Sequence, residues 1–300
     1  MRLPISVLVP IYGAPIHWEE CLESIRTQNI SEIVLVLNGV DDIYEKAIKN
    51  YCSNSSLFVL LEMEDANLVK ALNYGLQQSS YEFVGRLDID DVALPGRFED
   101  QYLHMQQDSS LVACGSQVIR FSETGESSSN YPITKIEVRG FMMTGCGVAH
   151  PSTMYLKSSV IEVGGYREEF KHAEDYDLWL RLLEVGDIDN IDKPLIKYRQ
   201  HELQISNKYR AAQDIATRAA LYSMNMRTRN QSDIPKAGQS LEEWLPKTKV
   251  PMKVKYGLAA ALQSGNLRLF RIVLSVFFTP FLTTSMVIRK IKRIFLARTR

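Results

Sequence analysis

The chain has 300 residues, enough for one large domain or two small ones, and its 35 basic residues balance 35 acidic ones. The four cysteines lack C-x-x-C spacing, which argues against a zinc site or a disulfide framework and indicates reduced thiols in a cytosolic compartment. The first residues do not resemble a secretory signal, because Pro4 and Pro10 interrupt a short apolar run.

The first ninety residues predict alternating strands and helices. Short apolar runs predict four strands, at 6–11, 32–37, 57–61 and 83–87. Apolar residues at helical spacing fill the gaps, and Asn67 is a favourable cap for the third helix. Such alternation predicts a parallel sheet, and the near-continuous apolar strands predict that helices cover both faces. This half of the chain has the pattern of a nucleotide-binding domain. It contains neither the dinucleotide fingerprint G-x-G-x-x-G nor a P-loop.

The fourth strand ends in three carboxylates, Asp88, Asp90 and Asp91. Clustered carboxylates beside a buried strand are costly unless a cation meets them, and oxygen ligands suit Mn²⁺ or Mg²⁺. In open α/β sheets, ligands bind at the carboxyl ends of the strands. We therefore interpret Asp88-Ile89-Asp90 as a metal and nucleotide-diphosphate site. The alternative is an acidic turn that caps the next helix, with Asp91 as one solvated charge.

The pattern after Arg97 is less regular. We expect a helix at 97–108, a strand at 111–121, a polar loop at 122–130, a loop over the site at 142–150, a strand at 152–157, a helix at 174–185 and a short strand at 196–199.

Three further motifs in this part each have two interpretations. Glu174 and Asp175 open a helix, where they either favour the helix dipole or project a general base into the cleft. His201 follows Tyr198-Arg199 at a strand end and is either structural or a further metal ligand. His150 follows a glycine-containing loop and either touches substrate or packs the loop.

Eight short motifs occur in order between Ile5 and Ser206. They are VLVPIY at 7–12, ALNYG at 71–75, RLDIDD at 86–91, PGRF at 95–98, HPS at 150–152, GGYR at 164–167, EDYDLWLR at 174–181, and Tyr198-Arg199-x-His201. Together they resemble the inverting, GT-A-fold glycosyltransferases of family 2, especially the bacterial surface-polysaccharide branch.

The resemblance implies a fold and two regions. Residues 1–206 would form a GT-A (Rossmann-like) catalytic domain, an α/β fold with a mostly parallel sheet flanked by helices. Residues 207–300 would form a helical C-terminal extension. The donor would be a nucleotide-diphosphate sugar, with UDP-sugars favoured, and the acceptor a hydroxyl of a glycan or lipid-linked molecule in cell-surface polysaccharide synthesis.

The resemblance also implies site residues. Asp90 would hold Mn²⁺ or Mg²⁺, with Asp88 on the metal or the ribose and His201 as a further ligand. Asp175 would be the catalytic base, and His150 and Glu174 would contact the acceptor. The implied nucleotide-sugar-binding residues are Pro10, Tyr12, Asn38, Asn73, Arg86 and Asp88. Asn38 is a departure, because the family usually has an acidic residue at this point, in contact with the nucleotide base.

Two other functions stay open. A sugar-nucleotide nucleotidyltransferase also uses carboxylates and metal, but Tyr12-Gly13-Ala14-Pro15 does not resemble its glycine-rich basic loop. A non-catalytic membrane-bound module that binds a sugar or nucleotide is disfavoured by the presence of the Asp88 and Asp90 pair together with Asp175. No nucleic-acid partner is expected.

The C-terminal tail carries a strong charge asymmetry. No acidic residue follows Glu243, whereas twelve basic residues do, so the body is near −12 and the tail near +12. Residues 272–288 are uncharged, but seventeen residues with Pro280 are marginal for a transmembrane helix. We expect an amphipathic tail that lies on the inner face of the cell membrane and a cytoplasmic, peripherally associated protein. The alternative is that this segment packs on the catalytic domain.

Overall fold

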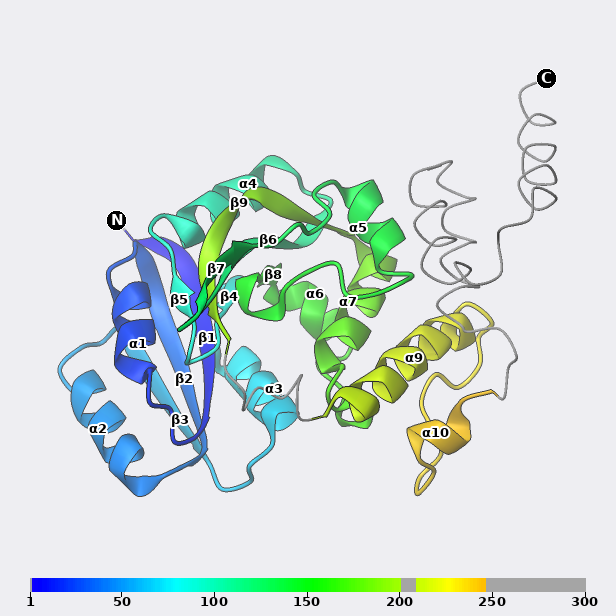
Figure 1. The fold of residues 1–300 in the computed structure, drawn as a ribbon, viewed down its shortest axis with the longest axis horizontal. Coiled ribbons are helices and arrows are strands. Elements are labelled where there is room, and N and C mark those ends of the chain that lie inside the picture. The colour runs from blue at the N-terminus through cyan, green and yellow to red at the C-terminus, as the bar shows by residue number, and fades with distance from the viewer. Residues whose placement is uncertain (1, 201–208, 247–300) are drawn as a thin grey trace.

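The protein is described from a computed structural model that covers residues 2–200 and 209–246. Its main element is one mixed sheet with the strand order β3-β2-β1-β4-β8-β6-β9-β5, and β7 pairs with β6 outside this path (Figure 1). The strands are β1 (Leu3–Gly13), β2 (Ile30–Val40), β3 (Phe58–Met63), β4 (Phe83–Arg86), β5 (Val92–Ala93), β6 (Leu111–Ser122), β7 (Gly125–Ser128), β8 (Met154–Leu156) and β9 (Asp187–Arg199).

The sheet has two halves of different construction. Strands β3, β2, β1 and β4 pair in parallel throughout. Beyond β4, the short strand β8 runs antiparallel to both of its neighbours, β6 and β9 pair in parallel, and β5 is antiparallel to β9. The predicted α/β sheet is confirmed, and its parallel part is the first half.

Helices cover both faces of the sheet, and β1 shows how the sequence assigns the faces. Successive side chains of a strand point to opposite sides. Val7 and Val9 pack in the core with α1, α2 and α4, whereas Leu8 packs in the core with α3, α6, α7 and α9. The helices are α1 (Trp18–Arg26), α2 (Asp42–Cys52), α3 (Leu68–Gln78), α4 (Arg97–Gln107), α5 (Lys135–Phe141), α6 (Lys157–Glu162), α7 (Glu174–Val185), α9 (Arg210–Arg227) and α10 (Leu241–Trp244), with short 3₁₀ turns η1 (His150–Ser152) and η2 (Glu168–Phe170).

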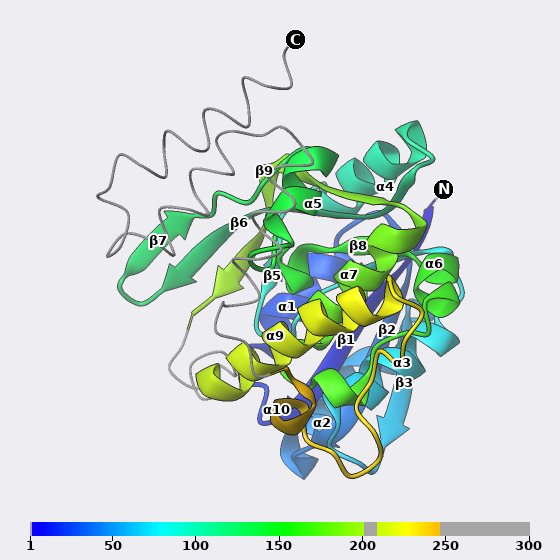
Figure 2. The ribbon, with the colours of Figure 1, turned by 90° about the vertical axis from the view of Figure 1, so that its right-hand side faces the viewer.

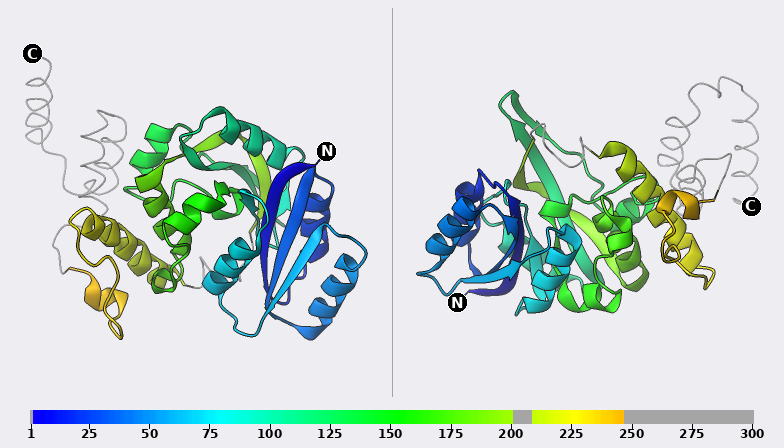
Figure 3. Two further views of the ribbon diagram at one scale, coloured as in Figure 1. Left: turned by 180° about the vertical axis from the view of Figure 1, so that it is seen from behind. Right: turned by 90° about the horizontal axis from the view of Figure 1, so that it is seen from below.

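The two ends of the described chain lie apart. Helices α1 and α2 flank one end of the molecule, and α9 and α10 lie at the other end in both views of Figure 3.

The prediction of a polar loop at 122–130 is wrong. Strand β7 turns back on the end of β6, with Ser122 opposite Gly125 and Ile119 opposite Ser128. All four residues of β7 are exposed and none is apolar, so the sequence shows no alternation of apolar and polar residues that would predict this strand.

Three other boundaries differ from the sequence analysis. Helix α5 was not predicted, although its capping box of Thr134 and Glu137 is visible in the sequence. Helix α6 begins at Lys157, where the predicted strand was to end. Strand β9 is thirteen residues long because its polar first half pairs with β6, whereas only 196–199 was predicted.

Some predictions fall outside the described residues, namely the ligand role of His201 and the membrane-associating tail after residue 246. Among the helices that the structure describes, none combines the length and the apolar character that a membrane crossing requires.

The four cysteines are unbridged, and burial raises the pKa of each thiol. Cys21, Cys52 and Cys114 are buried and Cys146 is half-buried. Burial raises the pKa of Cys52 to about 11. For Cys21 and Cys146 the pKa lies well above the usual value, because burial is reinforced by nearby carboxylates.

Candidate active site

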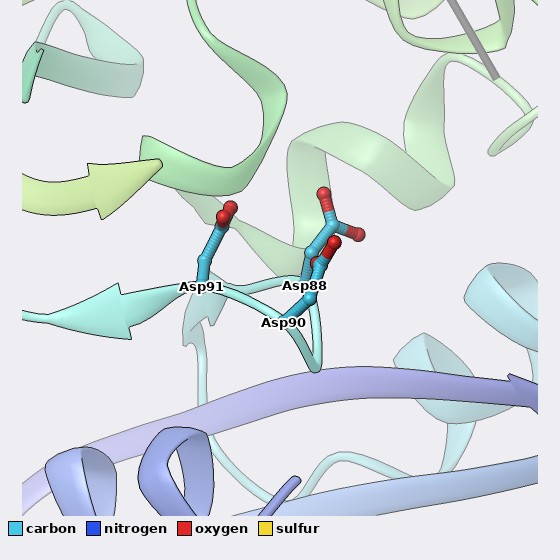
Figure 4. Close-up of side chains that lie close together, drawn as sticks. All are labelled: Asp88, Asp90 and Asp91. Atoms are coloured by element: carbon cyan, nitrogen blue, oxygen red, sulfur yellow. The ribbon is translucent and has the colours of Figure 1, made fainter. Parts of the chain in front are cut away.

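The three carboxylates after β4 form one cluster. Strand β4 pairs in parallel with β1, so the turn of Asp88, Asp90 and Asp91 stands at the carboxyl end of β4, beside the second half of β1. Each residue offers a carboxylate oxygen, and these oxygens lie within 4.8 Å of one another. Figure 4 shows all three side chains on the same side of the turn, with Asp88 and Asp90 next to each other. Three such oxygens make a donor set suited to a hard divalent cation.

Asp88 is held by a buried arginine. Arg86 is 3% exposed at its side chain, and its Nη1 donates to Asp88 Oδ2 at 2.7 Å while Nη2 lies 2.5 Å from Oδ1. Arg97, fully buried, donates from Nη2 to the backbone oxygen of Arg86 at 2.6 Å. Burial raises the pKa of Asp88, Arg86 lowers it and Asp90 raises it further. Arg86, expected to bind the donor, therefore has a bidentate partner within the protein.

Asp91 is not a solvated charge. Its side chain is 1% exposed, and Oδ1 accepts a hydrogen bond of 2.8 Å from the backbone N–H of Arg199. Its buried Oδ2 has no hydrogen-bond partner in the part of the chain that the structure describes. Burial raises its pKa well above the usual value, and Asp88 and Asp90 add to this effect. An orphaned buried oxygen beside two other carboxylates fits a cation site.

Arg199 is a site residue that the sequence analysis did not identify. Its Nε donates to the backbone oxygen of Asp90 at 2.9 Å, and its Nη2 donates to Glu20 Oε2 at 2.5 Å. It thereby joins the end of β9 and helix α1 to the acidic turn. The sequence signal was the arginine in the Tyr198-Arg199-x-His201 motif, of which only His201 was considered.

The first turn of α7 brings a second pair of carboxyls to the site. Asp175 is half-buried, and its Oδ1 accepts from the backbone N–H of Tyr176 at 2.7 Å. Burial raises the pKa of Asp175, the Tyr176 hydrogen bond and Arg86 lower it, and Asp88 raises it. Burial, with Asp175 as the second cause, raises the pKa of Glu174 to about 7. Asp175 thus lies within electrostatic reach of both Arg86 and Asp88.

The ends of β1 and β2 present an aromatic ring. Pro10 is buried within β1, whereas Tyr12, at the end of that strand, is 66% exposed. A side chain at Gly39 would meet the Tyr12 ring at 3.6 Å, so this ring packs beside the Gly39 backbone, which has a φ of +73°. Asn38 is 2% exposed, and its Oδ1 accepts from the backbone N–H of Asn67 at 2.9 Å.

Asn73 and His150 both contact Tyr166. The Asn73 amide donates to the Tyr166 backbone oxygen and accepts from its N–H, each at 2.8 Å. A Cβ on Gly165 would lie 2.6 Å from Asn73 Oδ1, so this close approach requires glycine. His150 is 9% exposed, and its Nε2 shares a hydrogen bond of 2.9 Å with the Tyr166 hydroxyl. Burial, then Arg86, lowers the pKa of His150 well below the usual value, so it is neutral. These contacts match the loop-packing interpretation of His150.

Two open pockets lie away from the carboxylates. One, of about 550 Å³, is lined by His104, Lys135 and Asp189 near the start of β9. The acidic turn contacts the opposite end of β9, at Arg199. The other, of about 620 Å³, lies beside Asn73 and Tyr74 and is lined by acidic residues that follow β3. Neither pocket is lined by Asp88 or Asp175.

Comparison with known proteins gives a consistent result. Residues 6–164 match the model of glycosyl transferase family 2. The amylovoran biosynthesis glycosyltransferase AmsE of Erwinia amylovora is 33% identical over 228 residues, which cover 74% of this chain and 85% of the relative. The O-antigen biosynthesis glycosyltransferase WbnJ of Escherichia coli is 34% identical over 207 residues, or 66% of this chain and 80% of the relative.

Solved structures with the same fold are more distant in sequence. Residues 1–349 of Staphylococcus aureus TarS in complex with UDP-GlcNAc align with a TM-score of 0.59 at 18% identity, covering 91% of this chain and 84% of that one. The mannosyltransferase PcManGT of Pyrobaculum calidifontis in complex with GDP-Man and Mn²⁺ aligns with a TM-score of 0.55 at 16% identity, covering 92% and 81%. At this identity the likeness concerns the fold.

Proposed function

The chain belongs to glycosyl transferase family 2, and from this premise we propose that it transfers a sugar from a nucleotide-diphosphate sugar to a hydroxyl group with inversion at the anomeric carbon. The observation that carries the proposal is the meeting of two carboxyl groups with different surroundings. One is the set of Asp88, Asp90 and Asp91 at the carboxyl end of β4, and the other is Asp175 on α7, whose pKa the charge of Asp88 raises.

The acidic cluster is the proposed donor site. Asp88, Asp90 and Asp91 would hold Mn²⁺ or Mg²⁺, and the orphaned oxygen of Asp91 supports this assignment. When bound, the ion offsets negative charge on the departing diphosphate. Arg86 keeps the Asp88 carboxylate in one orientation, and Arg199 fixes the backbone of the turn. The exposed ring of Tyr12 offers a stacking surface for the nucleotide base.

Asp175 is the proposed base. The acceptor hydroxyl oxygen bonds to the anomeric carbon, the bond from that carbon to the diphosphate oxygen breaks, and the hydroxyl proton passes to Asp175. Attack and departure on opposite faces of the sugar ring invert the configuration, as in inverting glycosidases. The backbone N–H of Tyr176 orients Asp175, and the raised pKa of its carboxyl makes it a better proton acceptor than an exposed aspartate.

The relatives suggest the substrate class and the setting. The structures similar in fold hold UDP-GlcNAc in one case and GDP-Man in another, and we favour a UDP-sugar for this chain. The relatives act in amylovoran and O-antigen biosynthesis, so we propose a surface-polysaccharide acceptor that is a glycan or is lipid-linked. Cytoplasmic location with peripheral association at the inner face of the membrane belongs to the same proposal, on the basis of the basic tail.

The donor site is tested by calorimetry of UDP binding with and without Mn²⁺. We expect metal-dependent binding by the wild type, loss of the metal dependence in Asp90→Ala, and wild-type binding in Glu162→Ala, an exposed acidic residue on α6. If UDP does not bind, GDP, dTDP and CMP follow, with Asn38 as the residue that changes base preference. Absence of metal-dependent binding for every nucleotide would contradict the donor site.

The reaction is tested with radiolabelled donor. Labelled sugar transferred to an acceptor supports the glycosyltransferase. Formation of a nucleotide sugar from sugar phosphate and nucleoside triphosphate would instead support the nucleotidyltransferase. Binding without any product would support the non-catalytic module.

A further inference from the structure

A buried ion network lies directly behind the first turn of α7. Asp177, two residues after Asp175, has a side chain that is 0% exposed. Arg167 donates hydrogen bonds to both oxygens of the Asp177 carboxylate, from Nε to Oδ2 at 2.9 Å and from Nη2 to Oδ1 at 2.5 Å. Arg181 donates to Oδ2 from Nη2 at 2.8 Å and to the Val163 backbone oxygen from Nη1 at 2.6 Å. One carboxylate thus faces two guanidinium cations in a region that excludes water.

The network is completed from the C-terminal region. Arg167 Nη1 donates to Asp233 Oδ2 at 2.6 Å, and its Nη2 donates to Ser223 Oγ at 2.9 Å. Arg227, at the end of α9, donates from Nη1 to the same Asp233 oxygen at 3.2 Å and to Ser223 Oγ at 2.7 Å. Asp233 therefore pairs with both Arg167 and Arg227 and joins them to one another.

Apolar packing joins the same two elements. Helix α9 contacts α7 and η2, and it lies beside α7 in Figure 2. Ala216, Ala219 and Leu221 of α9 share one buried core with Leu178 and Leu182 of α7. Helix α9 therefore packs against α7 through the same hydrophobic core to which the buried α7 residues belong.

The start of α7 needs an external support. Its N-cap residue is Ala173, which has no side-chain oxygen to cap the helix, and the first-turn N–H of Tyr176 is bonded to the Asp175 carboxylate instead. His172, just before it, has a φ of +76°, a conformation that costs free energy in a non-glycine residue and persists only where the surroundings enforce it. The ion pair of Arg167 with Asp177 lies next to this start of the helix, two residues from Asp175.

We propose that Asp233 and α9 are positioning elements of the active site, which hold α7 so that Asp175 points at the acceptor. The catalytic unit then extends at least to Asp233, past the boundary at residue 206 that the sequence analysis predicted. Asp233 acts through Arg167 and Asp177 and touches no substrate. The kinetic part of this proposal rests on the proposed function, whereas the structural part does not.

Hydrogen exchange of the full-length protein tests the structural part without any ligand. In Asp233→Asn, the surplus charge of Arg167 and Arg227 loosens their contact, so amides in 174–181 should exchange about tenfold faster at 10 °C. Amides of β1 and β4 should be unchanged. Asp233→Glu, which restores the charge, should recover most of the protection. The matched control is Glu242→Gln, an exposed carboxylate on α10, which should exchange like the wild type. Faster exchange confined to 223–233 in Asp233→Asn would overturn the proposal.

Transfer kinetics test the functional part. Because small misplacements of a base are costly, Asp233→Asn should lower kcat by about tenfold or more while the donor KM stays within about twofold. The assay is run at 10 °C, with folding verified by circular dichroism, so that a lower melting temperature cannot mimic the effect. A kcat equal to that of the wild type in fully folded Asp233→Asn would overturn the positioning role. If the wild type transfers no sugar, the proposed function fails, while the exchange result still decides whether Asp233 holds α7.

Discussion

The two halves of the sheet differ in the contacts that hold the helices around the proposed site. In the parallel half, β1 and β2 are mostly apolar on both faces, with Ser6 and Glu32 as a buried polar pair, and helices pack closely against them. Gly75 of α3 shows how tight the contact is, because a Cβ there would lie 2.2 Å from Leu8 Cδ1 and 2.8 Å from Val36 Cγ2. In the other half, the buried charges Asp177, Arg167 and Arg181 add ion pairs to the apolar contacts of α7 with the core.

This difference corresponds to a division of tasks. The parallel half carries the acidic cluster of the proposed donor site, and α7, which packs on β6 and β9 of the other half, carries the proposed base. Apolar contacts do not depend on orientation, so side chains can shift within an apolar core at little cost. Hydrogen-bonded ion pairs fix one relative orientation of the groups that they join. A catalytic base must lie within hydrogen-bond distance of the hydroxyl that it deprotonates, so fixing its orientation by ion pairs favours the reaction.

The largest effect is expected when the base itself is changed. Asp175→Asn cannot accept the acceptor proton, so the transfer rate should fall by about 10²–10⁴-fold. UDP binding should be unchanged, because the donor site belongs to the other half of the sheet. Calorimetry and a radiolabel assay on the same preparation measure both quantities, with exposed Asp192→Asn as the matched control. Normal transfer by Asp175→Asn would refute the division of tasks.

A smaller effect is expected from the charge of Glu174. Its pKa is raised from 4.5 to about 7, so folding favours its neutral form. The stability that this residue contributes is therefore complete below pH 4.5 and is lost as the pH rises through 7. Glu174→Gln should match the wild type near pH 4 and exceed it at pH 8, by up to about 3 kcal/mol in the free energy of unfolding.

Urea denaturation at both pH values measures this difference. Glu169→Gln, an exposed neighbour on η2, should change neither curve. If the free energy of unfolding of the wild type and of Glu174→Gln differed by the same amount from pH 4 to pH 8, the charged form of Glu174 would not destabilise the folded protein.

The smallest effect is expected in the parallel half. Gly75→Ala forces a methyl group against Leu8 and Val36, and overpacking of this kind costs about 1–3 kcal/mol. The better helix propensity of alanine offsets about 1 kcal/mol of this cost. Gly145→Ala is the control, because its Cβ would meet only Phe141, at 3.7 Å. A urea midpoint of Gly75→Ala equal to that of the wild type would show that the apolar half has more freedom than its contacts suggest.

Most of the first half could be predicted from the sequence, because its information is local. Apolar runs such as residues 6–11 fix the strands, and the carboxylates of Asp88 and Asp90 follow the fourth run directly. The burial of Asp91 could not be predicted, since it depends on a backbone N–H contributed by Arg199, 108 residues later.

The second half was harder because its determinants are polar and distant in sequence. Strand β7 consists of exposed polar residues, and its pairing with β6 leaves no pattern. Arg167 and Asp177 were seen as parts of two separate motifs, and nothing local indicates that Asp233 joins them. The proposed roles of Pro10, Tyr12, Asn38, Asn73 and His150 stay predictions, although the contacts of Asn73 and His150 with Tyr166 now explain why a stable fold needs these side chains.

The buried thiols make the protein convenient for site-specific labelling. Only a thiolate reacts quickly with a maleimide, and burial keeps the pKa of Cys21, Cys52 and Cys146 above the usual value. A single cysteine placed on the exposed strand β7, for example at Ser127, would therefore be the fastest-reacting thiol at neutral pH. A fluorophore could then be attached at that position without prior removal of the native cysteines.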